Sequence, residues 1–244
     1  MNDSNPVNQT DAPQSEQLAE NVRQIRQEIT EACERADRDP EEVQICAVTK
    51  NRPIDAIEAL NDEGLTYIGE NRVQEAERKF RFLPDDCRMD LVGHLQSNKT
   101  SLAVQLFNGM QSVDRLKIVD YLQRHCEKRD LHLPVFLQVN ASGETSKFGV
   151  PPEDVKPVLD ELMEAEALDV RGFMTMAPYV DDPEEVRPIF SRLREMRDRY
   201  SDEYGEEAPV ELSMGMTQDY PVAVEEGSTV VRIGRGFFDG TEWE

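Results

Sequence analysis

The chain has 244 residues, of which 27 are Lys or Arg and 50 are Asp or Glu, so its formal net charge at pH 7 is −23. Nucleic acid phosphates would repel a chain this acidic over most of its surface, and no stretch approaches the roughly 18 consecutive apolar residues that a membrane-spanning helix needs. We therefore expect no nucleic acid and no membrane among its partners.

The N-terminal region divides into two parts. Residues 1–14 are rich in Asn, Asp, Pro and Gln and lack the apolar core of a signal peptide, so we expect a disordered lead. Residues 15–244 are assigned to one folded domain. Its first element is a long amphipathic helix, predicted from apolar residues at helical spacing: Leu18, Val22, Ile25, Ile29 and Cys33.

The remainder of the chain alternates between short apolar runs and longer helical patterns. The predicted strands are residues 43–49, 65–69, 89–93, 109–113, 134–140, 169–174, 209–213 and 229–233. The predicted helices between them are residues 53–63, 71–80, 97–107, 114–129, 152–166, 183–203 and 217–226. This order is typical of parallel βαβ units, and eight strands close a (β/α)8 barrel. We therefore predict an α/β fold, a single (β/α)8 TIM barrel with an extra N-terminal helix. An open doubly wound sheet is the rival fold, but the Gly-rich fingerprint after its first strand is missing.

Lys50 ends the first predicted strand, and the chemistry of such barrels sits where strands end. We expect this lysine at the rim of a closed, dry barrel, where desolvation favours the neutral amine that a Schiff base requires. The alternative is a surface lysine whose ammonium group reaches solvent.

The loops after the seventh and eighth strands resemble a phosphate site, which barrels often build there from backbone N–H groups and short hydroxyl side chains. The first loop, residues 213–217, provides Ser213, Thr217 and a glycine, and the second, residues 232–236, provides glycine-flanked amides and arginines. A lysine facing such a site indicates an aldehyde cofactor that carries a phosphate, and pyridoxal 5′-phosphate (PLP) fits that description. A barrel that binds another phosphorylated metabolite without covalent chemistry is the alternative.

Motifs in the same order along nearly the whole chain after residue 15 resemble those of the pyridoxal phosphate homeostasis protein family, whose fold is similar to the N-terminal barrel of alanine racemase. The matching segments are residues 47–50, 68–75, 93–99, 138–140, 146–149, 171–177, 212–216 and 227–234.

This resemblance implies a role for each candidate cofactor-binding residue. Lys50 corresponds to the Schiff-base lysine, and Arg232 to the residue that faces the pyridine nitrogen and keeps it unprotonated, because a cation repels the proton. Asn71 lies near the cofactor, and Met214 is a candidate to pack on its ring. The phosphate cradle consists of Ser213, Thr217, Gly234 and Arg235, the last two acting through backbone amides.

The sequence departs from the family pattern at two places. Met89 and Asp90 stand where Trp-His is usual before the third-strand glycine motif, which leaves the packing beneath strand three open. Thr217 stands where serine is more usual, a change that keeps the hydroxyl.

We expect a binding protein rather than an enzyme, holding PLP on Lys50 for intracellular homeostasis and delivery, with PLP-dependent apoenzymes as candidate recipients. A racemase of similar fold takes a second base, a tyrosine, from a separate C-terminal domain, and we expect none here, because the chain ends at Glu244, just past strand eight. Tyr179 and Tyr220 follow strands six and seven and are the tyrosines that could approach the site. A low-activity PLP-dependent amino-acid racemase is the alternative. Without the second domain, we expect a monomer.

The cysteines bear on metal binding and on the redox compartment, and the ratio of Lys to Arg bears on the salt content of the cytoplasm. No pair of the four cysteines has CxxC spacing, and the three histidines lie near no cysteine cluster, so we expect no metal site and the reduced thiols of a cytoplasmic protein. The cations are seven Lys and twenty Arg, and an acidic, Lys-poor surface suits a salt-rich cytoplasm that screens self-repulsion. An ordinary acidic protein is the alternative.

Overall fold

The eight predicted strands form a closed parallel barrel in the computed structural model, which describes residues 12–144 and 148–243. Each strand pairs with its neighbours in sequence, and the first pairs with the last, with Gln44 opposite Val230. The strands are β1 (Gln44–Val48), β2 (Tyr67–Glu70), β3 (Arg88–Leu91), β4 (Gly109–Val113), β5 (Leu133–Gln138), β6 (Leu168–Met174), β7 (Glu211–Met216) and β8 (Val230–Ile233). The predicted fold class is confirmed, and the rival open sheet is wrong because β1 and β8 close the ring.

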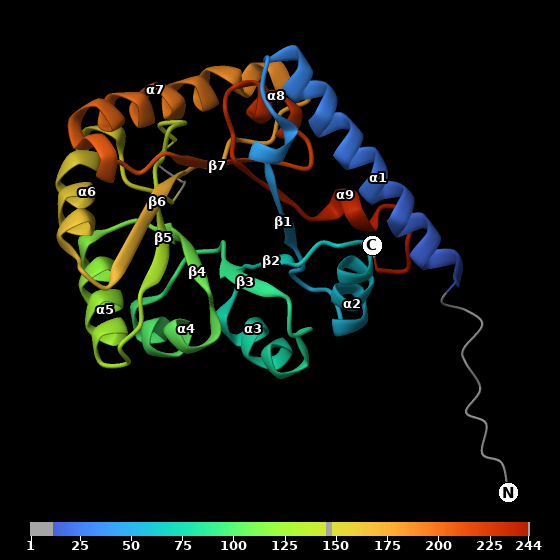
Figure 1. The fold of residues 1–244 in the computed structure, drawn as a ribbon, viewed down its shortest axis with the longest axis horizontal. Coiled ribbons are helices and arrows are strands. Elements are labelled where there is room, and N and C mark those ends of the chain that lie inside the picture. Colours follow the sequence, from blue (N-terminus) through green and yellow to red (C-terminus); the bar gives the residue numbers. More distant parts are fainter. Residues whose placement is uncertain (1–11, 145–147, 244) are drawn as a thin grey trace, which may run out of the picture.

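The helices lie outside the strands (Figure 1). They are α1 (Ala12–Arg35), α2 (Ile54–Asp62), α3 (Val73–Lys79), α4 (Thr100–Leu106), α5 (Leu116–Glu127), α6 (Val155–Glu164), α7 (Arg187–Tyr204), α8 (Tyr220–Glu225) and α9 (Arg235–Phe238). Their apolar faces pack on the outward side chains of the strands, which explains the helical period between strands in the sequence. None of the helices within the described ranges is long and apolar enough to cross a membrane.

Helix α1 is the extra N-terminal helix, and it lies against α8 and α9 (Figure 1). The five apolar residues that predicted it are all buried. The helix begins at Ala12, three residues earlier than the predicted start at Ser15, so the predicted lead is wrong for residues 12–14. Residues 1–11 of that lead lie outside the described residues.

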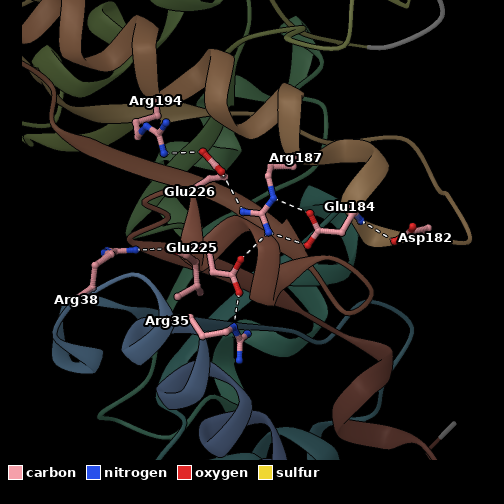
Figure 2. A network of polar contacts seen from close by, with 9 residues as sticks. Arg35, Arg38, Asp182, Glu184, Arg187, Arg194, Glu225 and Glu226 are labelled. Atoms are coloured by element: carbon pink, nitrogen blue, oxygen red, sulfur yellow. Dashed lines mark hydrogen bonds and ion pairs between the residues drawn. The ribbon is translucent and has the colours of Figure 1, made fainter.

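A network of ion pairs ties α1, α7 and α8 together (Figure 2). The guanidinium of Arg187 bonds to Glu225 at 2.6 Å and to Glu226 at 3.0 Å. Glu225 also bonds to Arg35 of α1, and Glu226 bonds to Arg194 of α7, both at 2.6 Å. These contacts fix the C-terminal end of α8 against α1 and α7.

Beneath the opening, the barrel interior contains two kinds of side chain. One is an apolar group that includes Cys46, Val48, Phe136 and Met174. The other is a chain of buried polar residues centred on Gln111 of β4. This chain of polar residues reaches the barrel opening through Ser213, which bonds to both Gln111 and Arg232.

Candidate cofactor site

A cavity of about 440 Å³ opens at the C-terminal ends of the strands, where barrel chemistry is expected. Six of the eight predicted site residues line it together: Lys50, Asn71, Thr217, Arg232, Gly234 and Arg235. They come from the ends of β1, β2, β7 and β8, which are far apart in sequence and adjacent in the closed barrel. Ser213 and Met214 do not line it.

Lys50 directly follows β1, in a turn that is exposed to solvent. No hydrogen bond or ion pair holds its amine among the described residues. The expectation of a desolvated amine in a dry barrel is therefore wrong for the structure as it stands. Lys50 lines the cavity at its rim, as expected, but it stands in an exposed turn, so solvent reaches it there.

Arg232 forms the floor of the cavity and is almost completely buried, with 4% of its surface exposed. Its Nη1 donates to the Ser213 hydroxyl and its Nη2 donates to the Thr175 carbonyl at 2.7 Å. Burial lowers the pKa of the guanidinium. Two of its nitrogens are thus tied to neutral acceptors, which fixes the plane of the group beneath the cavity.

Ser213 and Met214 are placed elsewhere because β7 runs three residues further than predicted, to Met216. Alternation along a strand sends successive side chains to opposite faces. Ser213 therefore points into the barrel, where it supports Arg232, and Met214 points outward into the main hydrophobic core. The prediction that Met214 packs on the cofactor ring is wrong, since its side chain is on the far side of the strand.

The pairing of β7 with β8 shifts register between Ser213 and Met216, and this irregularity changes the direction of the chain at the end of β7. Gly215 lies within it at φ +92°, and a Cβ there would be 2.6 Å from the Cβ of Ala223. This bend brings Thr217 to the cavity, where its hydroxyl accepts from the Gly236 N–H at 3.4 Å. Gly234 and Arg235 begin α9, whose first N–H groups have no acceptor within the helix.

Asn71 is held at the opposite wall by a close approach of two loops. A Cβ on Gly93 would be 2.2 Å from the Asn71 carbonyl oxygen, so only glycine lets the β3 loop pass there. The next residue, His94, lines the cavity and stacks on Phe148 with ring centroids 4.2 Å apart. Its Nδ1 lies 3.2 Å from the Asp114 carboxylate.

Several lining residues had no assigned role in the sequence. His94 and Met176 follow strands three and six, where the strand-end rule places them, but neither was assigned a role. Asp219 follows strand seven, and the same rule could have found it. Phe148 lies in the loop after β5, within the family motif at residues 146–149, but no role was assigned to it. Of the two candidate tyrosines, Tyr179 lines the cavity and is 71% exposed. Tyr220 is buried and donates to Glu28 of α1, so it does not reach the site.

The structure shows how Met89 and Asp90 of β3 pack, which the sequence left open. Met89 is buried in the main core, and Asp90 is buried inside the barrel. The Asp90 carboxylate accepts hydrogen bonds from the Tyr67 hydroxyl and from Gln111 Nε2 at 3.2 Å. Gln111 Oε1 accepts from Ser213 at 2.7 Å, which completes a line of hydrogen bonds from Arg232 to Asp90.

The family model described as "Alanine racemase, N-terminal domain" matches residues 14–241. The fold and the site thus define a barrel of that class. The chain belongs to the pyridoxal phosphate homeostasis protein family. It is 38% identical over 220 residues to the member from Aquifex aeolicus, covering 90% of this chain and 96% of the relative. It is 37% identical over 230 residues to the member from Pseudomonas aeruginosa, covering 93% and 96%.

Solved structures agree with this assignment. PipY of Synechococcus elongatus with PLP bound superimposes with a TM-score of 0.78 at 32% identity, covering 91% of this chain and 99% of PipY. An unknown protein from Bifidobacterium adolescentis has a TM-score of 0.85 at 32% identity, covering 98% and 100%. Alanine racemase from Clostridium difficile, at 15% identity and a TM-score of 0.72, shares the fold over 91% of this chain and 59% of the racemase.

Proposed function

We propose that this chain binds pyridoxal 5′-phosphate in the cavity and holds it covalently through a Schiff base with Lys50. The observation that carries the proposal is that an exposed lysine amine, a buried guanidinium and a phosphate-type loop meet around one cavity of about 440 Å³. That volume lies in the usual range for small-molecule sites. When bound, the cofactor supplies an aldehyde for the amine and an electron-withdrawing ring.

Each lining residue has a task in this proposal. The Thr217 hydroxyl and the backbone N–H groups of Gly234 and Arg235 would hold the phosphate, because donors of this kind at a helix start suit an anion. Arg232 would face the ring nitrogen and keep it unprotonated by charge repulsion. Asn71 would bound the cofactor from the β2 side. Ser213 contributes by holding Arg232, and Met214 has no part.

The relatives support the proposal by what their names state. The members from Aquifex aeolicus and Pseudomonas aeruginosa are called pyridoxal phosphate homeostasis proteins, and PipY was solved with PLP bound. The hydrogen-bond donors at the cavity fit the same ligand. The Thr217 hydroxyl and the backbone N–H groups suit its phosphate, and Arg232 suits its ring nitrogen. We infer from both that the chain takes part in intracellular PLP homeostasis.

We further propose that the chain delivers PLP rather than transforming substrates with it. Lys50 and Tyr179 are exposed at the cavity, so the site is open to water, whereas catalysis on this kind of cofactor gains from its exclusion. An open site also lets an acceptor lysine of a PLP-dependent apoenzyme approach the anchor. The test is reactivation of such an apoenzyme by the loaded protein.

The absorbance spectrum with PLP, before and after borohydride, tests the anchor. Wild type is expected to show a visible band that borohydride removes, leaving a reduced adduct that peptide mapping places on Lys50. Lys50→Ala is expected to lose the band and the adduct entirely, because no other lysine lines the cavity among the described residues. Lys128→Ala, which removes an exposed lysine at the end of α5, is the matched control.

Two results would contradict the anchor. An unchanged adduct in Lys50→Ala would place the covalent link elsewhere. Tight binding of PLP by wild type without any reducible adduct would indicate a barrel for phosphorylated ligands with no covalent chemistry. Exchange of an amino acid's α-hydrogen with solvent, present in wild type and lost in Lys50→Ala, would replace delivery by the racemase alternative.

A further inference from the structure

The two residues that flank Lys50 are tied to a buried ionic cluster behind the cavity. The cluster consists of Glu70 at the end of β2 and Glu75 and Lys79 on α3. Glu70 is completely buried and Lys79 is 8% exposed. The Lys79 ammonium lies 2.7 Å from Glu70 Oε1 and 2.9 Å from Glu75 Oε1.

Thr49, which precedes Lys50, is held at two atoms by this cluster. Its hydroxyl donates to Glu70 Oε1 at 2.6 Å, and its carbonyl accepts from the Lys79 ammonium at 2.8 Å. The third proton of the ammonium is used on Glu75, so Lys79 has no donor to spare. Thr49 is completely buried, which prevents water from replacing either bond.

Asn51, which follows Lys50, is held from the other side. Its backbone N–H donates to Glu75 Oε1, the same oxygen that accepts from Lys79. Asn51 has φ +60°, in the left-handed region that non-glycine residues rarely adopt. The hydrogen bond to Glu75 therefore stabilises an unfavourable backbone conformation at Asn51.

We propose that Glu70, Glu75 and Lys79 are positioning residues that fix the backbone on both sides of Lys50 and so aim its free amine across the cavity. The proposal rests on the proposed function of Lys50 as the covalent anchor. The physical reason is that an exposed lysine whose amine has no hydrogen bond or ion pair within the described residues samples many rotamers, and a rigid backbone limits the directions that these rotamers can reach. The cluster is behind the cavity and lines neither the proposed phosphate cradle nor the floor at Arg232.

Glu75 is the residue to vary, because it is partly exposed and its loss leaves the Glu70–Lys79 pair intact. Glu75→Ala removes the acceptor of the Asn51 N–H, whereas Glu75→Gln retains an oxygen that can accept both bonds. Glu77→Ala, on the exposed face of the same helix, is the matched control. The paired variant Glu70→Gln with Lys79→Met tests the Thr49 side without leaving a buried charge alone.

Three measurements separate positioning from general damage. The first is amide hydrogen exchange at Asn51 in the protein without ligand. The second is the rate of adduct formation at saturating PLP, followed by absorbance. The third is the affinity for pyridoxine 5′-phosphate, which has the ring and the phosphate but lacks the aldehyde.

In Glu75→Ala we expect exchange at Asn51 to rise at least tenfold and adduct formation to slow about tenfold, with pyridoxine 5′-phosphate affinity changed less than twofold. Glu75→Gln should restore both, and the paired variant should slow adduct formation. Equal behaviour of Glu75→Ala and Glu77→Ala would overturn the proposal, as would a parallel loss of pyridoxine 5′-phosphate affinity. A wild type without any adduct on Lys50 would instead remove the proposed function, while exchange at Asn51 would still report whether Glu75 holds the backbone.

Discussion

Asp90 places a buried carboxyl group inside the barrel, with 7% of its surface exposed. Its carboxyl is buried among Tyr67, Gln111 and the thiol of Cys46, with Arg88 the cation and Glu211 an acidic neighbour. Burial raises its pKa, and the hydrogen bonds from Tyr67 and Gln111, with the charge of Arg88, only oppose that shift. The folded protein therefore binds a proton at Asp90 more tightly than the unfolded chain does.

The pH dependence of stability follows from this sign. The stability that a raised carboxyl pKa contributes is complete below the unfolded value, about 3.9, and is lost as pH rises through the folded value. Asp90→Asn removes the titration, so we expect the stability of the variant relative to wild type to increase with pH across this window and then level off. Urea unfolding of both proteins at a series of pH values measures it.

Burial also raises the pKa of Glu70, which remains in both proteins and cancels in the difference. Burial raises the pKa of Glu211 as well, and the charge of Asp90 adds to that shift, so the measured difference includes the coupling between these two carboxyls. Asp86→Asn, which changes an exposed aspartate nearby in sequence, serves as the control. A constant difference between Asp90→Asn and wild type at all pH values would show that Asp90 does not titrate in this way.

At the scale of elements, α1 supports the proposed phosphate loop through α9. The amide of Asn21 donates to the carbonyl of Phe237 at 3.0 Å and to that of Asp239 at 2.9 Å. It thereby satisfies carbonyls at the C-terminal end of α9, a helix of only four residues that cannot be stable alone. The extra helix thus holds the element on which Gly234 and Arg235 depend.

We expect Asn21→Ala to destabilise the protein by about 1–3 kcal/mol, because it leaves the buried carbonyl of Phe237 and the partly buried one of Asp239 without this donor. The affinity for inorganic phosphate should fall with it, since α9 loses its support. Gln24→Ala, on the exposed side of the same helix, should change stability by less than about 0.5 kcal/mol. Urea unfolding and phosphate binding measure both effects, and equal stabilities of the two variants would show that α9 does not need Asn21.

At the scale of the whole molecule, the net charge of −23 dominates the electrostatics. The ion network of Figure 2 gathers part of the scarce positive charge where α1, α7 and α8 meet, with Arg187 bound to three carboxylates. The many acidic side chains on the remaining surface repel one another, and salt screens repulsion between exposed charges more than it weakens partly buried pairs.

We therefore expect the free energy of unfolding to increase between about 0.1 and 2 M KCl, where the screening length falls from about 10 Å to below 3 Å. A variant with Asp85→Lys, Glu161→Lys and Glu166→Lys changes three exposed acidic residues and shifts the charge by six units, from −23 to −17. It should gain less stability from salt than wild type. Thermal unfolding over a salt series measures the difference, and indifference of the wild type to salt would favour an ordinary acidic protein.

The order of strands and helices could be read from the sequence because a half-buried helix and a buried strand leave different periods in hydrophobicity. Residues at the ends of the predicted strands were expected to share one site, because the C-terminal ends of all strands lie at the same end of a closed parallel barrel. The structure places six of them around one cavity: Lys50, Asn71, Thr217, Arg232, Gly234 and Arg235. The lysine and the phosphate-type loops indicated the ligand class, and the family motifs added the roles of the single residues. These conclusions depend only on local pattern and on the closure of the ring.

Tertiary structure alone decided the rest. The boundary of β7 sent Met214 to the core and Ser213 beneath Arg232, because a shift along a strand exchanges its two faces. The exposure of Lys50, the cluster behind it and the hydrogen bonds that reach Asp90 join residues from several strands and α3. Such contacts depend on distances between elements that no local pattern encodes, so the sequence determined which residues meet and the packing determined how each one is held.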